Sequence, residues 1–269
     1  MKKLFFFVAT VCTILSSCSK GDDSNNDQTN KVFVVKAIAR CDYNANSDRY
    51  YGDATGVTYD AKGRVINYGN YSFTYNGKSV IIKDETEENT VMYATLNDNG
   101  YITEAQRYET YNEREYKYEY QVIYNKSGRL TEMHIQEYVI KNNITFSVKE
   151  DDFYYEWENN NPVQVKWTER DLRDGSTSTD NYSYTYRTEK NNINIYPFTS
   201  CSIFANMLNS MIDEIACMFG LFGKFPTNLT KYENSHGSSY DYIFNDDGSI
   251  SQAMTSTGGN YYWTERYWY

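Results

Sequence analysis

Cysteine, histidine and proline are scarce in this chain, and each shortage narrows what the protein can be. The 269 residues include five cysteines, two histidines and three prolines. The cysteines beyond the amino-terminal apolar run are Cys18, Cys41, Cys201 and Cys217. They lack the close spacing of a zinc site, and with Cys18 set aside the odd number argues against a disulfide framework. His134 and His236 each stand alone, so we expect no metal.

Long apolar runs and an excess of basic charge are also missing. The amino-terminal apolar run covers only Leu4 to Leu15, whereas a membrane-spanning helix needs roughly 20 residues. Acidic side chains outnumber basic ones by 36 to 26, which disfavours nucleic acid and anionic lipid as partners. No cofactor motif or activated nucleophile stands out, so we expect neither a cofactor nor an enzyme.

The sequence leaves one disulfide possible. Cys201 and Cys217 fall in one predicted helix, where sixteen residues at about 1.5 Å each separate them by some 24 Å, too far for a bond. Only Cys41 could therefore pair with one of them.

The amino terminus indicates where the protein is delivered. Lysines at 2 and 3 precede the apolar run, as in a secretory signal. The ending Leu15-Ser16-Ser17-Cys18 resembles the lipobox of bacterial lipoproteins, which implies cleavage before Cys18 and acylation of its thiol, for example by palmitate. Ser19-Lys20-Gly21-Asp22-Asp23 resembles an acidic tag that directs lipoproteins of some gut anaerobes to the outer cell surface. The resemblance implies a lipid-anchored protein of the outer membrane, held at the cell surface.

The domain organisation follows from these segments. Residues 1–17 are predicted to be the signal peptide, and residues 18–30 the lipidated cysteine and a flexible tether rich in Ser, Asn and Asp. Residues 31–269 then form a single β-rich domain, a length within the range of one large all-β fold.

A turn pattern recurs in the predicted domain. Its copies begin with Asp or Asn, which accepts a local backbone hydrogen bond, and end with Gly, which takes positive φ without a Cβ clash. The copies are Asp60-Ala61-Lys62-Gly63, Asn97-Asp98-Asn99-Gly100, Asn125-Lys126-Ser127-Gly128 and Asn245-Asp246-Asp247-Gly248. Asn76-Gly77 suits a tighter type I′ turn. None completes a calcium-binding ligand set, so we interpret them as hairpin turns.

Between the turns, side chains alternate with a period of two. One strand places aromatic or apolar residues on one face and charged or amide residues on the other; the first set is Tyr116, Tyr118, Tyr120, Val122 and Tyr124. The pattern predicts a mainly β fold, a long antiparallel meander of hairpins that coils into an open or closed barrel-like sheet. Apolar residues at steps of three and four add one amphipathic helix near 202–222.

Two resemblances extend this interpretation. Tyr59-Asp60-Ala61-Lys62-Gly63-Arg64-Val65 and Tyr124-Asn125-Lys126-Ser127-Gly128-Arg129-Leu130-Thr131 resemble YD repeats, the β-hairpin units of Rhs-type shells. Together with the lipobox, the tyrosine strands and the late helix, the chain resembles gut-anaerobe surface lipoproteins catalogued as a domain of unknown function with a porin-like fold. The resemblance implies fold and location and supplies no active residues.

Aromatic side chains suggest a binding role. Exposed rings can stack on sugars or clasp peptides, so we expect a non-catalytic protein that binds glycan or peptide. The ligand-binding candidates are Trp157, Trp167, Trp263 and Trp268. The competing interpretation is that these rings only hold the sheet together through cross-strand pairs.

Two alternatives remain. A hydrolase could use paired carboxylates such as Glu156 with Glu158, or Glu169 with Asp171, although such acids ordinarily pair with Lys and Arg across a sheet. A structural role in an envelope complex is the other. The ending Tyr267-Trp268-Tyr269 is similar to that of outer-membrane barrels, but charges opposite the tyrosines are unlike a lipid-facing surface.

Overall fold

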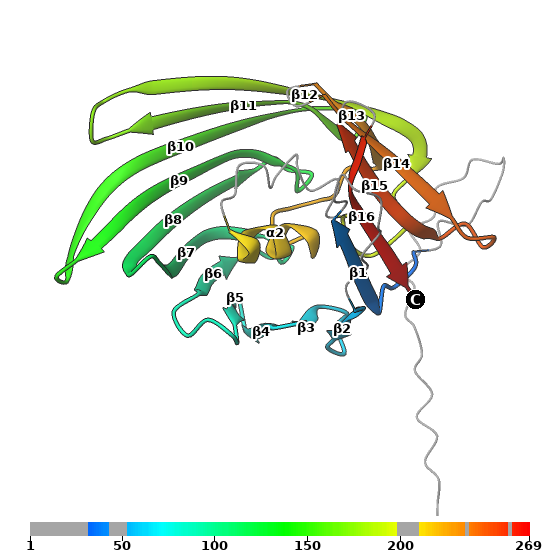
Figure 1. Ribbon diagram of the computed structural model, residues 1–269, viewed down its shortest axis with the longest axis horizontal. Helices are drawn as coiled ribbons and strands as arrows, with labels where there is room; N and C mark the ends of the chain where they lie inside the picture. The colour runs from blue at the N-terminus through cyan, green and yellow to red at the C-terminus, as the bar shows by residue number, and fades with distance from the viewer. Residues whose placement is uncertain (1–31, 43–52, 198–209, 235–236, 258–259) are drawn as a thin grey trace, which may run out of the picture. The chain divides into compact units, whose positions relative to one another are not determined.

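The described part of the chain is a sheet that advances by hairpins and closes on itself (Figure 1). The computed structural model describes residues 32–42, 53–197, 210–234, 237–257 and 260–269. Within them the strands are β1 (Ala37–Asp42), β2 (Thr55–Tyr59), β3 (Val65–Tyr68), β4 (Tyr71–Asn76), β5 (Ser79–Asp84), β6 (Val91–Leu96), β7 (Ile102–Tyr111), β8 (Arg114–Tyr124), β9 (Leu130–Lys141), β10 (Ile144–Glu158), β11 (Asn161–Asp171), β12 (Thr177–Lys190), β13 (Asn228–Glu233), β14 (Ser238–Phe244), β15 (Ile250–Thr257) and β16 (Asn260–Trp268). Neighbours in sequence pair antiparallel, and β1 pairs with β16, so the sheet is a closed barrel. The mainly β prediction is confirmed, and the barrel is closed rather than open.

The strand register divides side chains between a lumenal and an outer face. A buried row crosses β4 to β8 inside the barrel and consists of Phe73, Ile82, Met92, Arg107 and Tyr118, each opposite the next. An outer row crosses β7 to β11 and consists of Gln106, Glu119, Gln136, Glu150 and Arg170. A second outer row, two residues along the strands, consists of Glu104, Gln121, His134, Asp152 and Thr168. The outer face of these central strands is therefore polar.

The recurrent turns form as their sequences predict. The Asp60 carboxylate accepts the backbone N–H groups of Lys62 and Arg64 at 2.8 and 3.0 Å. The Asn125 side chain makes the equivalent bonds in its own turn, and Gly63 and Gly128 take φ of 77° and 79°. Side-chain acceptor and glycine together complete the turn without strain.

Near the ends of several strands, an aromatic side chain donates a hydrogen bond to a backbone carbonyl of a neighbouring segment. The Tyr124 hydroxyl donates to the Ile102 carbonyl at 2.6 Å, and the Tyr59 hydroxyl donates to the Val35 carbonyl at 2.7 Å. Equivalent bonds join Tyr186 to Pro162, Tyr269 to Ile250 and the Trp157 indole to Leu130. A buried carbonyl is costly without a donor, so these tyrosines stabilise the end of the barrel.

Helix α2 (Met211–Met218) contributes to the same core as the inward-facing strand residues. Its N-cap Ser210 accepts the Ile212 N–H, and the chain turns away at Gly220, where φ is 76°. This glycine explains why the helix ends before the predicted limit of 222; residues 202–209 lie outside the described residues. Cys217 is free and buried. In the described ranges, no helix is long and apolar enough to cross a membrane.

Candidate ligand pocket in the barrel lumen

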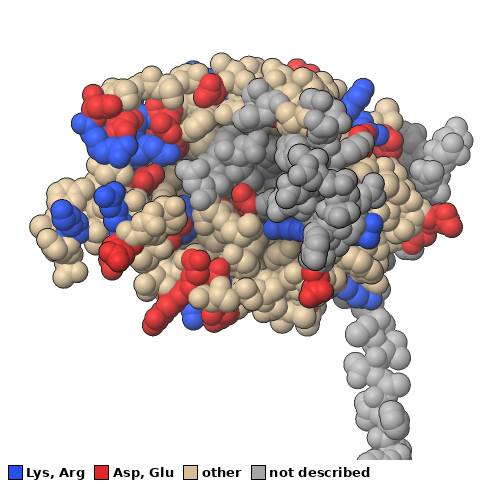
Figure 2. All heavy atoms as spheres, in the orientation of Figure 1, with Lys and Arg blue, Asp and Glu red and all other residues tan. Residues whose placement is uncertain are grey.

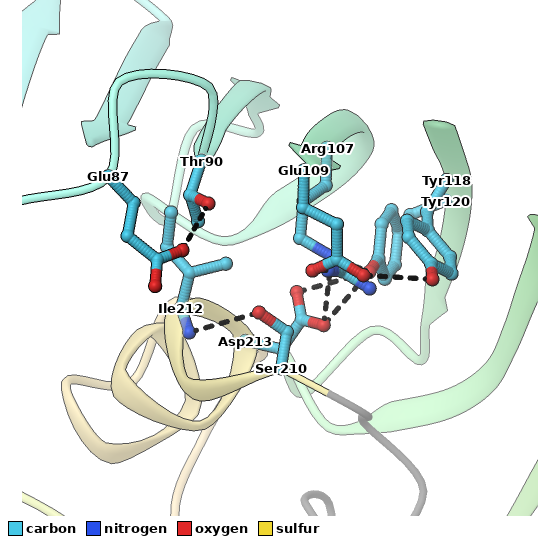
Figure 3. Close-up of polar contacts among 9 residues, drawn as sticks. All are labelled: Glu87, Thr90, Arg107, Glu109, Tyr118, Tyr120, Ser210, Ile212 and Asp213. Carbon is cyan, nitrogen blue, oxygen red and sulfur yellow. Dashed lines mark hydrogen bonds and ion pairs between the residues drawn. The ribbon is translucent and has the colours of Figure 1, made fainter. Parts of the chain in front are cut away.

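A buried ion pair fastens α2 to the barrel wall (Figure 3). Asp213 is fully buried, and its carboxylate lies 3.3 Å from Nε of Arg107, a lumenal residue of β7 that is only 1% exposed. Tyr120 on β8 completes the contact, because its hydroxyl accepts from Arg107 Nε at 2.9 Å and donates to Asp213 at 2.9 Å. Burial raises the pKa of Asp213 to about 6, while Arg107 and Tyr120 oppose that rise. The carboxylate is thus ionised at neutral pH.

The other face of the Arg107 guanidinium is also occupied. Its Nη1 pairs with Glu109, two residues along β7, and its Cζ atom lies 3.7 Å from the centre of the Tyr118 ring. The Tyr118 hydroxyl donates to Glu109 at 2.9 Å. A buried guanidinium is stable only when charge and hydrogen bonds surround it, and this cluster supplies both.

A second group of charged residues lies near α2, around Arg40 and Glu265. Arg40 on β1 pairs with the buried Glu265 of β16 at 3.3 Å, and its guanidinium approaches the Met218 sulfur at 3.6 Å. Glu214 lies among these charges with its Oε2 atom buried and without a hydrogen-bond partner. Burial raises the pKa of Glu214 to about 7; Arg40 opposes the shift, and Asp213 and Glu265 add to it.

Next to the Arg107 cluster, the lumen contains a hollow of about 510 Å³. Residues of the strands, of the connection between β5 and β6 and of the start of α2 line it: Tyr71, Asp84, Glu87, Thr90, Glu109, Thr110, Tyr111, Tyr116, Tyr118, Glu137, Ser210, Met211 and Ile212. Its lining holds carboxylates and tyrosines but no lysine or arginine among the described residues. Such a pocket offers negative charge and aromatic faces to a ligand that enters it.

The carboxylates of this pocket differ in their surroundings. Burial raises the pKa of Glu137, and nearby Lys149 partly offsets the rise. Burial alone would raise the pKa of Asp84. Hydrogen bonds from Thr86 and Tyr71 nevertheless hold this pKa below its usual range. The Glu87 carboxylate accepts the Thr90 hydroxyl at 2.9 Å. Asp84, whose pKa is lowered, is therefore charged at neutral pH and already oriented by protein donors.

The tryptophans proposed from the sequence lie on several parts of the barrel. Trp157, near the end of β10, uses its indole N–H for the structural bond to Leu130. Trp167 on β11 donates to Asp151 at 2.9 Å and stacks on Phe153 with ring centres 6.1 Å apart. Trp268 is 44% exposed at the end of β16. The side chain of Trp263 lies outside the described residues, and the tryptophan site stays a prediction.

The carboxylate pairs of the hydrolase hypothesis lie on β10 and β11. Glu156 and Glu158 are exposed near the end of β10. Glu169 pairs with Lys149 at 3.2 Å, and Asp171 pairs with Arg173. Within the described ranges, no group of three or more His, Cys, Asp or Glu residues is placed to hold a metal ion.

The residues that build the pocket were missed by sequence reasoning. Arg107 and Glu109 share the inward face of β7 with Ala105. Their position in the alternating pattern does not reveal that they have buried partners. Asp213 was a clearer signal, because it and Glu214 are the acidic residues of a helix whose other members are apolar. A buried acid demands a cation, and inward-facing arginines were the residues to search.

Comparison with known proteins gives the class of fold. No family model matches the chain, and no curated protein matches its sequence. Two solved structures share the architecture. A porin-like protein from Bacteroides vulgatus ATCC 8482 matches with a TM-score of 0.64 and 12% identity over 88% of this chain and 98% of that one. A porin-like protein from Bacteroides uniformis ATCC 8492 matches with a TM-score of 0.58 and 16% identity over 87% of this chain and 97% of that one.

The protein thus has a porin-like barrel fold. This confirms the fold part of the family resemblance seen in the sequence. The YD-repeat and lipoprotein parts of that resemblance stay predictions.

Proposed function

We propose that this chain is a lipid-anchored protein of the outer membrane, exposed at the cell surface, which binds a ligand without transforming it. The lipobox ending at Cys18 supports the anchor, and the acidic residues Asp22 and Asp23 support surface delivery. The fold is shared with porin-like proteins from Bacteroides. In the sequence, the predicted tether that ends at residue 30 lies between Cys18 and the strands of the barrel.

The polarity of the barrel supports a position outside the hydrocarbon. Membrane barrels carry an apolar outer band about 25 Å tall, with polar side chains inside. Here the two outer rows across β7 to β11 are polar, whereas α2 and apolar strand residues fill the lumen. Figure 2 also shows acidic and basic side chains spread over the visible face. An anchored barrel surrounded by water fits this distribution better than an embedded pore.

The lumenal pocket supports binding of a peptide through a positively charged group. Carboxylates and tyrosine rings line it without a basic side chain, and this is the observation that carries the proposal. An ammonium or guanidinium group would gain charge-assisted hydrogen bonds to Glu87 and Glu137 and contact the face of Tyr116. A basic peptide side chain is therefore favoured over a neutral sugar at this position.

A fractionation experiment tests the anchor. The wild-type chain should partition with membranes, and a Cys18→Ala variant should appear in the soluble fraction. Metabolic labelling with a palmitate analogue should mark only the wild type. A soluble wild type, or a Cys18→Ala variant that stays in the membrane, would contradict the anchored arrangement.

A binding experiment tests the pocket. Fluorescein-labelled tetralysine should bind the purified full chain at low salt, and labelled tetraglutamate should not. The double variant Glu87→Gln and Glu137→Gln should weaken tetralysine binding about tenfold or more, since each charge-assisted contact contributes about 1.5–3 kcal/mol. Glu156→Gln, an exposed control, should leave affinity unchanged. No tetralysine binding, or equal losses in both variants, would refute the pocket assignment.

A further inference from the structure

Two further hollows lie on the outer face of the barrel, away from the lumen. One of about 590 Å³ is lined by residues of β5 to β8, including Thr95, Glu104 and Gln121. The other, of about 630 Å³, includes Val91 and Tyr108. Both share Tyr93 and Gln106, so they form one elongated groove with these two side chains at its middle.

Two tyrosine rings give the groove an aromatic wall. Tyr93 on β6 and Tyr108 on β7 both point outward, and their ring centres lie 6.3 Å apart at an angle of 76°. Tyr93 is 49% exposed, which is high for a large aromatic residue in the middle of a barrel strand. An exposed ring held by an edge-to-face neighbour is a preformed stacking surface.

Polar side chains beside the rings are held in fixed orientations. The Tyr108 hydroxyl donates to Gln106 Oε1 at 3.2 Å, and Gln106 Nε2 donates to Glu119 Oε1 at 3.4 Å. Glu119 also accepts the Tyr138 hydroxyl at 2.9 Å. These contacts orient a planar amide next to the ring, with remaining donor and acceptor capacity toward the groove.

The neighbouring positions add groups ready to bond. Glu104 and Gln121 lie opposite each other on β7 and β8 and both line the groove. Along β6, the lining runs from Val91 to Thr95, a span of five residues whose four steps cover about 13 Å at the rise of a β-strand. An aromatic surface flanked by amide and carboxylate groups over this length suits a short chain of hydroxyl-rich rings.

Charge and topology limit the occupant. The lining contains several glutamates and no lysine or arginine among the described residues, and neighbouring Lys117 is paired with Glu119 at 2.6 Å, which disfavours an acidic ligand. An extended peptide usually binds a sheet by adding a strand at an open edge. Strands β5 to β8 are each paired on both sides, so the groove offers no edge for such pairing.

We propose that this outer groove binds a neutral oligosaccharide, with a sugar ring stacked on Tyr93 and its hydroxyls bonded to Gln106, Gln121 and Glu104. Apolar C–H faces of the sugar contact the tyrosine ring, and its hydroxyls replace the water around the amide and carboxylate groups. The groove is separate from the lumenal pocket and does not depend on the ligand proposed there.

Affinity gel electrophoresis and calorimetry with a defined set of sugars test the proposal. The neutral probes are cellotetraose, xylotetraose, mannotetraose and maltotetraose, and tetragalacturonate is the anionic comparison. At least one neutral probe should bind the full chain, and Tyr93→Ala should weaken that binding about tenfold or more, because it removes the stacking surface. Tyr93→Phe should retain most of the affinity.

Matched variants separate this site from the rest of the surface. Tyr154→Ala removes another outward tyrosine, 40% exposed on β10, and should leave sugar binding unchanged. Glu137→Gln in the lumenal pocket should also leave it unchanged, so loss of the peptide site and loss of the sugar site are distinguishable. Thermal unfolding confirms that each variant is folded.

Three outcomes would overturn the proposal. These are no binding of any neutral probe at millimolar concentration, binding of tetragalacturonate alone, and equal loss of affinity in Tyr93→Ala and Tyr154→Ala.

Discussion

Gln106 and Arg107 are neighbours in sequence, yet they face opposite environments. Gln106 points outward into the groove and bonds only at its tip, whereas Arg107 is buried and bonded by Asp213, Glu109 and Tyr120. An exposed polar group such as Gln106 can exchange its contacts for water at little cost, whereas the buried Arg107 charge depends on its partners in the protein. Substitutions on the two faces should therefore differ strongly in their effect on stability.

Removing one member of the lumenal ion pair should have the largest effect. Asp213→Ala leaves the Arg107 charge buried without its main partner, which should lower the free energy of unfolding by about 3–5 kcal/mol at pH 7.5. Urea unfolding measures it. Asp152→Ala, on the outer row, is the matched control and should change stability by less than about 1 kcal/mol. Equal effects at both positions would remove the distinction between the faces.

The pH dependence of stability probes Glu214, which lies near Arg40 and Glu265. The folded-state pKa of Glu214 is about 7, above its ordinary value of 4.5, so the folded protein binds a proton that the unfolded chain releases. Stability should fall as pH rises from about 4.5 to 7, by about 3 kcal/mol from this residue.

Replacing the carboxylate isolates that contribution. Glu214→Gln should flatten the fall in stability over this pH range and should raise stability at pH 8. Chemical unfolding at a series of pH values makes the comparison. A slope unchanged by Glu214→Gln would assign the pH dependence to other groups.

The tyrosine bonds at the end of the barrel should have a smaller effect. Tyr124→Phe leaves the Ile102 carbonyl without its hydroxyl donor and should cost about 1–2 kcal/mol. Tyr154→Phe removes an outward hydroxyl and should be nearly neutral. Thermal unfolding of both variants measures the difference in their stabilities. An unchanged stability of Tyr124→Phe would show that water replaces the lost donor.

The smallest effect is expected for an outer ion pair. Arg170 and Glu150 lie in the outer polar row, 3.0 Å apart, with the arginine side chain 55% exposed. A double-mutant cycle with alanine should give a coupling of about 0.2–1 kcal/mol that disappears at high salt. A salt-resistant coupling of several kcal/mol would indicate that this outer row is shielded from water.

Local features of the fold could be predicted because they are written in short stretches of sequence. The alternation from Tyr116 to Tyr124 gives the correct inward face of β8, and the Asp60 and Asn125 turns form as their residues require. The tight hairpins at Asn142-Asn143 and Asn159-Asn160 were not predicted. Both residues of each pair have positive φ there, a conformation that asparagine tolerates.

Closure and the site depended on contacts between distant residues. Pairing of β1 with β16 joins the two ends of the described barrel, and no local pattern encodes that register. Likewise, Arg107 and Asp213 lie far apart in sequence, and only the fold brings them within 3.3 Å. An inward-facing charge has the same local signature as an exposed one until its partner is known.

The central claim is that the outer face of β7 to β11 meets water rather than lipid. A nitroxide spin label on Glu119→Cys in the lipid-anchored full chain, bound to vesicles, tests it most directly, with the labelled wild type as the background for native cysteines. The account predicts ready collision with a water-soluble nickel complex. Collision with membrane-dissolved oxygen and protection from nickel would contradict it.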